Sequence, residues 1–541
     1  MSEPAAAATA TADSRRPEPS EPRPASAWAW RWPGPVEPTG LGSLAAAAGA
    51  GLVTAVVVPL DRPGLGWVIA AAAAAGAIAT GVRRPSAGAG ASVVAGVTTD
   101  APARPWERLA WALVTLALLA VGAVRAAEWL FGLCLLAAAA TTVLALTGGR
   151  TVRGLVLGAV LLPVAVGRAA TGSRPGVATL HRRVRARMRV GSTVAVTGLL
   201  LLGFGALLAS ADAAFSTLLG HALPAIGPAT VLRTVLLFTA AAALALAGVV
   251  LLATPPAVDR ADPAPAAGRV RTAEWAIPVG ALVMLFASFV AVQLTVLFGG
   301  ARYVLEPDGP SYAQHARGGF WQLLTVTVLT LLVIGVAGSV APRRRPAQRW
   351  LLRGLVGALA LLTLVIVASA LFRMHTYQQA YGFSRLRVLV SVVELWLGLV
   401  FLLVIAATVR LRAGWLPRAV VATGVAAVLA LAALNPDQFI AERNIDRWAT
   451  GGHQLDLGYL AGLSADAAPA LACLPVPHRT VALARIEADL ADPPDDWRSA
   501  NLSRAAARKA VRSEACSGRE SWHSRFAGST SASTPRSRSP E

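Results

Sequence analysis

Apolar stretches of about 20 residues, separated by shorter polar segments, repeat along most of this chain. A helix of about 20 apolar residues crosses the roughly 30 Å hydrocarbon core of a bilayer, so each stretch is a candidate transmembrane helix. We expect an all-α, polytopic integral membrane protein with eleven such helices, at residues 41–60, 64–82, 106–124, 127–147, 190–210, 229–253, 275–298, 318–340, 351–371, 388–409 and 416–434.

A twelfth apolar stretch, at residues 154–167, is shorter than the others. Its length would give a rise of only ~21 Å as a helix. It contains Pro163 and is flanked by Arg153 and Arg168. We therefore expect a re-entrant or interfacial segment here rather than a spanning helix.

The distribution of arginine predicts how the helices are oriented. With eleven spans and the N-terminus inside, most arginines before residue 435 fall on the inner side, and the outer loops hold only Arg62, Arg125, Arg302, Arg317, Arg373, Arg385 and Arg387. Cytoplasmic loops of membrane proteins carry such an excess of positive charge. The sequence thus predicts a bacterial plasma-membrane protein with a cytoplasmic N-terminus and an extracytoplasmic C-terminus.

The composition agrees with a membrane protein. Of the 541 residues, 55% are hydrophobic and only 14% are charged, against about 25% charged residues in a soluble protein. The net charge of +20 does not indicate nucleic-acid binding, because the arginines lie in short loops between apolar stretches. Lys509 is the only lysine, and this excess of arginine and alanine indicates GC-rich coding, as in actinobacteria.

The remaining segments complete the predicted organisation. Residues 1–40 and the Ser/Thr/Arg/Pro-rich residues 517–541 are expected to be disordered. Between them we expect the first four helices at 41–149, the re-entrant segment with a basic cytoplasmic loop at 150–189, the other seven at 190–434 and a helical extracytoplasmic tail at 435–516. In that tail Asp456 can cap a helix, and Cys473 and Cys516 could pair if the compartment is oxidising.

The strongest candidate for chemistry is Glu394, a carboxylate about seven residues, or ~10 Å, inside its predicted helix. Gln293, Arg233 and Asp212 are expected at a similar depth on the same side. An ionised side chain in hydrocarbon costs several kcal/mol unless it is paired or reaches water. This grouping indicates an outward-facing polar cavity or, alternatively, a structural salt bridge such as Arg233 with Glu394.

Further polar side chains would surround that cavity. Tyr377, Tyr381 and Arg385 would form its rim, and His315 and Arg302 belong to a neighbouring outer loop. The chain contains no GxxxxGK[ST] motif, CxxC pair or Cys/His cluster, so we expect neither a cofactor nor a metal. The expected partners are the lipid bilayer and a small-molecule or lipid ligand at the outer face.

Three functions follow from these residues. The first is a transporter-like or ligand-handling membrane protein that uses the cavity. The second is a membrane-embedded enzyme acting on a lipid-linked substrate, with Asp437, Glu442 or His315 as acid or base, although the acids are spread along one helix-like segment. The third is a scaffold or signalling protein, which would need no buried Glu394.

Several blocks of the chain resemble a bacterial family: QLTVLFGG, SYAQHARGGFWQLL, FRMHTYQQAYGFSRLR, LNPDQFIAERNIDR and LDLGYLAGLSADAAPAL. Together they are similar to the multi-pass membrane proteins of domain of unknown function 4173, related to the 4153 group. The similarity runs from about Leu199 to Val511, and residues before about 150 match only in being membrane-like. The family has no assigned activity, so the resemblance implies a membrane topology and no catalytic residues.

Overall fold

A computed structural model describes residues 32, 40–82, 104–172, 228–259, 271–298, 312–451, 454–491 and 495–512. Throughout these residues the chain forms helices and turns and no strand. The all-α prediction is therefore confirmed. The expected spanning stretch at 190–210 and the terminal segments expected to be disordered lie outside the described residues.

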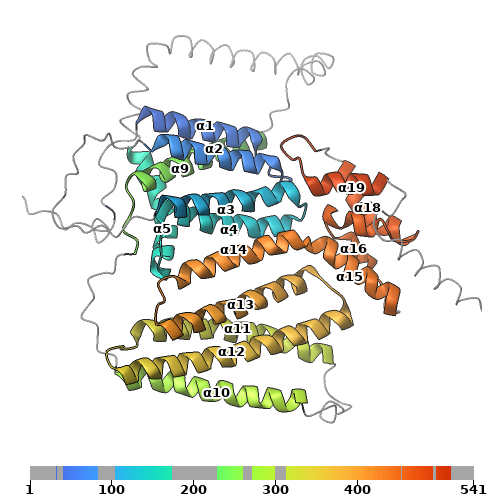
Figure 1. Ribbon diagram of the computed structural model, residues 1–541. Helices are drawn as coiled ribbons and strands as arrows, with labels where there is room; N and C mark the ends of the chain where they lie inside the picture. Colours follow the sequence, from blue (N-terminus) through green and yellow to red (C-terminus); the bar gives the residue numbers. More distant parts are fainter. Residues whose placement is uncertain are drawn as a thin grey trace, which may run out of the picture.

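Ten apolar helices lie side by side, some running in one direction and the others in the opposite direction (Figure 1). They are α1 (Leu41–Val57), α2 (Leu65–Gly81), α3 (Pro105–Val124), α4 (Glu128–Thr147), α9 (Pro228–Ala253), α10 (Thr272–Phe298), α11 (Tyr312–Val340), α12 (Pro346–Tyr381), α13 (Arg385–Arg410) and α14 (Leu416–Leu434). Each of them corresponds to one of the predicted stretches.

Their length and surface fit a bilayer. Nine helices of the described part are long and apolar enough to span, counting α5 (Val152–Gly172), whereas α1 and α2 are shorter. Only 17% to 44% of each candidate window is buried inside the protein. Most of this apolar surface therefore faces outward, as expected where lipid covers it. The predicted number of eleven spans stays a prediction.

The helix α5 replaces the expected short re-entrant segment with one continuous helix. Near its start Gly154 lies against Asp259, just after α9, and near its end Arg168 stacks on Trp32 at 4.2 Å. The indole Nε1 of Trp32 donates to the carbonyl of Thr254, 2.9 Å away, so both ends of α5 meet the end of α9. Residues 154 and 168 are ~21 Å apart along a helix, so α5 crosses the ends of its neighbours (Figure 1).

Two groups of helices meet at α14. One group comprises α1 to α4 with α9, the other comprises α10 to α13, and α14 packs between α4 and α13 (Figure 1). Arg418 at the start of α14 donates to Glu107 Oε2 (2.7 Å) and to the carbonyls of Gly148 and Gly149. At the other end of α14, Arg125 Nε donates to the carbonyl of Ala432 at 2.7 Å. Both ends of α14 are thus fastened to the first group.

The C-terminal residues form a cap over one end of the bundle, which we call the C-terminal cap (Figure 1). It consists of α15 (Pro436–Gly451), α16 (Leu457–Ala461), a 3-10 turn at Ala465–Ala467, α17 (Ala468–Leu471), α18 (His478–Ala491) and α19 (Leu502–Arg512). Its core is apolar and fully buried around Ile440, Ile445 and Leu471. Asp456 caps α16 as expected, accepting from the backbone N–H of Tyr459 at 2.9 Å.

The cap also reaches the turns between the early helices. Asp466 accepts from the backbone N–H groups of Ala126 and Ala127 (2.9 and 2.7 Å), where a carboxylate complements the N-terminus of α4. Asn501 Nδ2 donates to the carbonyls of Gly122 and Arg125, both at 2.8 Å. The cap is therefore anchored on the helix ends by polar side chains as well as by its apolar core.

Candidate functional site

The turn between α12 and α13 contacts polar residues of the C-terminal cap. Gly382 has a φ of +81°, a backbone conformation that favours glycine. Ser384 caps α13 by accepting from the N–H of Arg387. The guanidinium of Arg387 then turns back and donates to the carbonyls of Tyr381 (2.9 Å) and Gly382 (2.5 Å).

The helix α15 holds this turn from the other side. The side chain of Asn444 donates to the carbonyl of Phe383 (2.9 Å) and accepts from its N–H (2.8 Å). One turn further along α15, Arg447 donates to the carbonyls of Gln379 (3.0 Å) and Ala380 (2.9 Å). Cations near a helix C-terminus are favourable because its last carbonyls are unpaired, so both arginines stabilise the end of α12.

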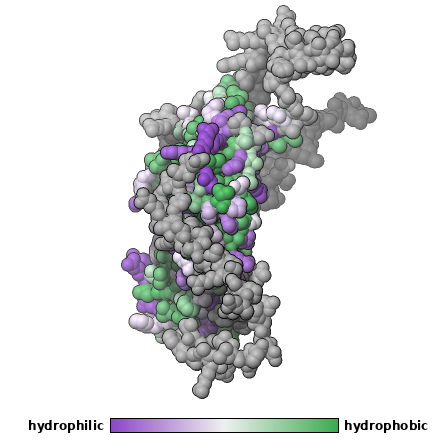
Figure 2. Space-filling model, turned by 90° about the vertical axis from the view of Figure 1, so that its right-hand side faces the viewer, coloured by the Kyte–Doolittle hydropathy of each residue, from purple (hydrophilic) through white to green (hydrophobic). Residues whose placement is uncertain are grey.

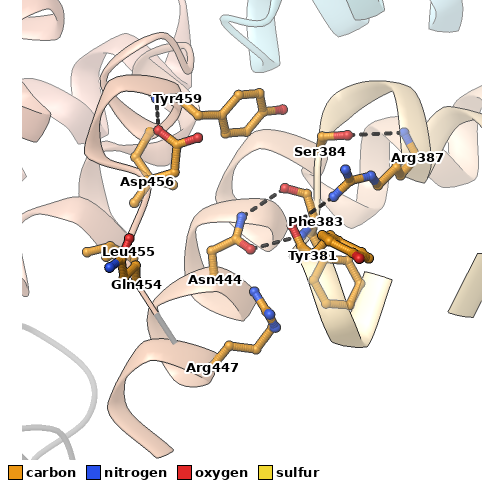
Figure 3. Close-up of a pocket in the computed structure, with 11 residues that line it drawn as sticks. Tyr381, Phe383, Ser384, Arg387, Asn444, Arg447, Gln454, Leu455, Asp456 and Tyr459 are labelled. Atoms are coloured by element: carbon orange, nitrogen blue, oxygen red, sulfur yellow. Dashed lines mark hydrogen bonds between the residues drawn. The ribbon is translucent and has the colours of Figure 1, made fainter. Parts of the chain in front are cut away.

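A pocket of about 160 Å³ lies between this turn and the cap (Figure 3). Its walls come from the end of α12, the start of α13, the face of α15 and the segment leading into α16. The lining residues are Tyr381, Phe383, Ser384, Arg387, Asn444, Arg447, Gln454, Leu455, Asp456, Tyr459 and Leu460. Figure 2 looks onto this end of the molecule, where hydrophilic residues lie among hydrophobic ones.

The pocket carries more positive than negative charge. Within the described residues, neither Arg387 nor Arg447 forms a salt bridge. Burial, and then the neighbouring charge of Arg387, lowers the pKa of Arg447 below its ordinary value. The acid in the lining, Asp456, is engaged as the cap of α16. The two guanidinium groups therefore face the pocket without a neutralising partner.

A line of polar side chains runs from this pocket into the bundle. Gln378 Nε2 on α12 donates to Ser391 Oγ (3.0 Å) and to the carbonyl of Arg387 (3.2 Å) on α13. Glu394 follows Ser391 by three residues and so lies on the same side of α13. It is only 1% exposed, and neither carboxylate oxygen has a hydrogen-bond partner among the described residues.

The predicted partner of Glu394 is wrong. Arg233 on α9 contacts Asp61 at 3.3 Å and donates to the carbonyl of Val58 at 2.9 Å, so its charge serves the turn after α1. Depth within the membrane did not reveal this, because α9 packs on α1 and α2 while α13 packs on α12 and α14. Arg233 and Glu394 therefore belong to different helix groups.

The other predicted site residues have separate positions. Gln293 lies on α10, and both polar atoms of its buried amide lack a partner in the described part of the chain. Tyr377 stacks on Tyr381 (4.7 Å between ring centres) and lies under the guanidinium of Arg387 (4.6 Å), so these residues do adjoin the pocket. Asp212, Arg302 and the side chain of His315 lie outside the described residues.

Arg385, predicted as part of the rim, forms a buried ion pair instead. Its Nε and Nη2 donate to the two carboxylate oxygens of Asp437 at 2.9 and 2.5 Å. Asp437 is fully buried and also accepts from the N–H of Ser464 (2.9 Å) and from Trp129 Nε1 (3.3 Å). Burial alone would raise the pKa of Asp437, but the hydrogen bond and charge of Arg385 outweigh it and lower that pKa.

These contacts also bear on the other candidates. Among the described residues no group of His, Cys, Asp and Glu could hold a metal ion. Cys473 is disulfide-bonded, while Cys516, the partner expected for it, lies outside the described part of the chain. The sequence did not single out Asn444, although it lies three residues before Arg447 on one helix, a spacing that could have indicated a shared polar face.

The fold and the pocket define a multi-pass helical membrane protein with a polar site at the capped end of the bundle. The chain belongs to the family described as domain of unknown function (DUF4153), whose match covers residues 113–474. The resemblance to the 4153 group is thereby supported, whereas 4173 is not shown. The match begins within α3, earlier than the resemblance suggested. No curated protein and no solved structure matches the chain.

Proposed function

We propose that this protein handles a ligand in the manner of a transporter, through a polar site open to the outer face of a bacterial plasma membrane. Arginine near the ends of the membrane helices supports this orientation. In the described part, the end opposite the cap carries Arg104, Arg108, Arg150, Arg345, Arg349, Arg353, Arg410, Arg412 and Arg418, whereas the helix ends and turns beneath the cap carry Arg62, Arg125, Arg373, Arg385 and Arg387. Positive residues favour the cytoplasmic side. The C-terminal cap and its pocket would then lie outside.

The observation that carries the proposal is the environment of Glu394. Charged residues inside a membrane are costly and usually pair with another group or mark a pathway for an ion, proton or substrate. Other buried acids of the described chain, such as Asp437 and Asp466, have several donors each. Glu394 has none, yet it lies below Ser391 and Gln378 on the side that leads to the pocket. The fold therefore leaves this buried carboxylate without the partner that a ligand or a proton could supply.

The membrane-enzyme alternative receives less support from these contacts. Its proposed base, Asp437, is saturated by Arg385 and Ser464 and cannot accept a further proton without breaking an ion pair. Glu442 accepts from Gln438 on the same helix at 3.0 Å. Asp437 and Glu442 therefore do not form the pair of carboxylates around one cleft that we would expect in such an enzyme.

The test is a structure of the full chain determined from native membranes. We expect non-protein density beside Glu394 or in the pocket above it in the wild type, and loss of the density beside Glu394 in Glu394→Gln. Glu442→Gln is the matched control, because it removes the same charge from α15 outside the membrane helices. Absence of density in the wild type, or identical density in all three proteins, would contradict the proposal.

A further inference from the structure

The pocket at the α12–α13 turn has hydrogen-bond donors that the fold does not use. In the described hydrogen bonds Arg387 uses Nη1 alone, and Arg447 uses Nε and Nη2. The Nε and Nη2 of Arg387 and the Nη1 of Arg447 therefore remain for another acceptor. Capping the end of α12 therefore uses only some of the hydrogen-bond donors of these two side chains.

The electrostatics of the pocket favour an anion. Two guanidinium groups line one small space, and the charge of Arg387 opposes that of Arg447. The acid in the lining, Asp456, caps the N-terminus of α16 and forms no salt bridge with either arginine among the described residues. An oxyanion placed between the arginines would relieve their repulsion and accept charge-assisted hydrogen bonds, the geometry in which arginine binds carboxylate and phosphate.

The size of the pocket limits the ligand. Its volume of about 160 Å³ is close to the ~150 Å³ that accommodates a benzene-sized molecule. Pockets for whole drug-sized ligands are larger, at about 300–1,000 Å³. The space therefore fits one phosphate or carboxylate group with a few attached atoms, whereas a nucleotide or a sugar polymer would have to remain mostly outside.

We propose that Arg387 and Arg447 bind the phosphate or carboxylate group of a ligand at the outer face of this protein. Figure 3 shows the two side chains approaching the α12–α13 turn from different directions, with Asn444 bonded to the same turn. The group belongs either to a free solute or to the headgroup of an anionic lipid. The inference deepens the proposed function, on which it rests for the side of the membrane and for the ligand-handling role.

The experiment measures binding of inorganic phosphate to the purified full chain by calorimetry, with sodium chloride at equal ionic strength as the reference. We expect Arg447→Gln to weaken binding about tenfold to a hundredfold, the loss that corresponds to one charge-assisted hydrogen bond. Arg443→Gln is the matched control, since it removes an exposed arginine of α15 that does not line the pocket. It should bind phosphate as the wild type does.

A second variant covers the case in which Arg447→Gln does not fold. Gln454 is exposed, lines the pocket and makes none of the described hydrogen bonds. Gln454→Glu therefore leaves the fold intact and adds a negative charge, which should weaken phosphate binding while the melting temperature stays unchanged. Equal phosphate affinity in wild type, Arg447→Gln and Gln454→Glu would overturn the inference.

Two further arms separate the sources of the anion and the two proposals. In phosphatidylcholine nanodiscs phosphate should bind, and added phosphatidylglycerol should compete only if the occupant is a lipid headgroup. Binding of neither phosphate nor phosphatidylglycerol would overturn the inference. Glu394→Gln should leave phosphate affinity unchanged, so failure of the Glu394 proposal and failure of the anion site give different results.

Discussion

Asp437 in the C-terminal cap and Glu394 in α13 are both buried carboxylates, at 0% and 1% exposure, but their surroundings differ. Asp437 accepts hydrogen bonds from a guanidinium, a backbone N–H and an indole. Glu394 accepts none from the described residues. A buried charge is stable only when it is paired. Asp437 therefore stabilises the fold through its partners, whereas Glu394 has no partner in the described part of the fold.

Other buried polar groups of the cap have hydrogen-bond partners, as Asp437 does. Arg504 is 6% exposed and is held by Asp495 (2.9 Å) and by the carbonyls of Pro63 and Ser499. Asp466 complements the N-terminus of α4. The contacts of Arg504 with Pro63 and of Asp466 with the start of α4 join segments far apart in sequence, so charged side chains fix the position of the cap on the helix ends. In contrast, the buried side chains of Gln293 on α10 and Glu394 on α13 form no hydrogen bond with the described residues.

The largest expected effect is on Asp437. Asp437→Ala leaves the partly buried guanidinium of Arg385 and the N–H of Ser464 without their buried acceptor, and it should lower the free energy of unfolding by about 3–5 kcal/mol. Arg385→Met combined with Asp437→Leu should recover much of this loss, because no uncompensated charge remains. Thermal unfolding in detergent measures both, with Asp446→Asn on the same helix as the control. Equal stability of Asp437→Ala and wild type would show that the pair of Asp437 and Arg385 does not stabilise the fold.

A smaller effect is expected from acid. The folded-state pKa of Asp437 lies below its ordinary value of 3.8, so its contribution to stability is present above pH 3.8 and is lost as the pH falls through the folded pKa. Asp496, with a pKa of about 2, titrates in the same direction but is substantially exposed and contributes less. Unfolding followed from pH 6 downward should show stability falling below about pH 4. The decline should be shallower in the Asp437→Leu/Arg385→Met protein.

The smallest effect is expected for Glu394. Because no described protein group pairs with Glu394, Glu394→Gln breaks no ion pair and should not lower the free energy of unfolding. Adding Arg233→Met should not alter the result by more than the roughly 0–1 kcal/mol of an exposed pair, because Arg233 contacts Asp61, which is 82% exposed. Melting temperatures of the single and double variants test this. A large loss in Glu394→Gln that Arg233→Met restores would show that the two charges do pair.

The periodicity of apolar residues predicted most of the fold, and its errors are informative. The stretch at 416–434 coincides with α14, and 388–409 differs from α13 by a few residues. In contrast, 351–371 is only the middle of α12, which continues to Tyr381. Hydropathy reports how apolar the side chains are and not whether the backbone is helical. The predicted stretch therefore ends where the polar side chains after Leu371 begin, although the helix continues.

The site was predictable only in part. The burial of Glu394 follows from its place within an apolar stretch, and Tyr381, expected at the rim of a cavity around Glu394, lines the pocket between the α12–α13 turn and the cap. The roles of Arg233 and Arg385 were not predictable, because sequence gives a residue's depth along its own helix and not the identity of the neighbouring helix. The pocket itself depends on α15 meeting a turn about 60 residues earlier, as in the contact of Asn444 with Phe383 (|i−j| of 61).

The contact between Arg504 and the carbonyl of Pro63 has a consequence for biosynthesis, because 441 residues separate the two groups. Chains are synthesised at about 5–20 residues per second, N-terminal parts first, so α1 and α2 wait roughly 20–90 s for the segment that completes their turn. During that time the carbonyls of Gly122 and Arg125 also lack Asn501. The early helices thus form an unfinished assembly at first, and a chain that stops before residue 495 lacks both Arg504 and Asn501, which hold their turns.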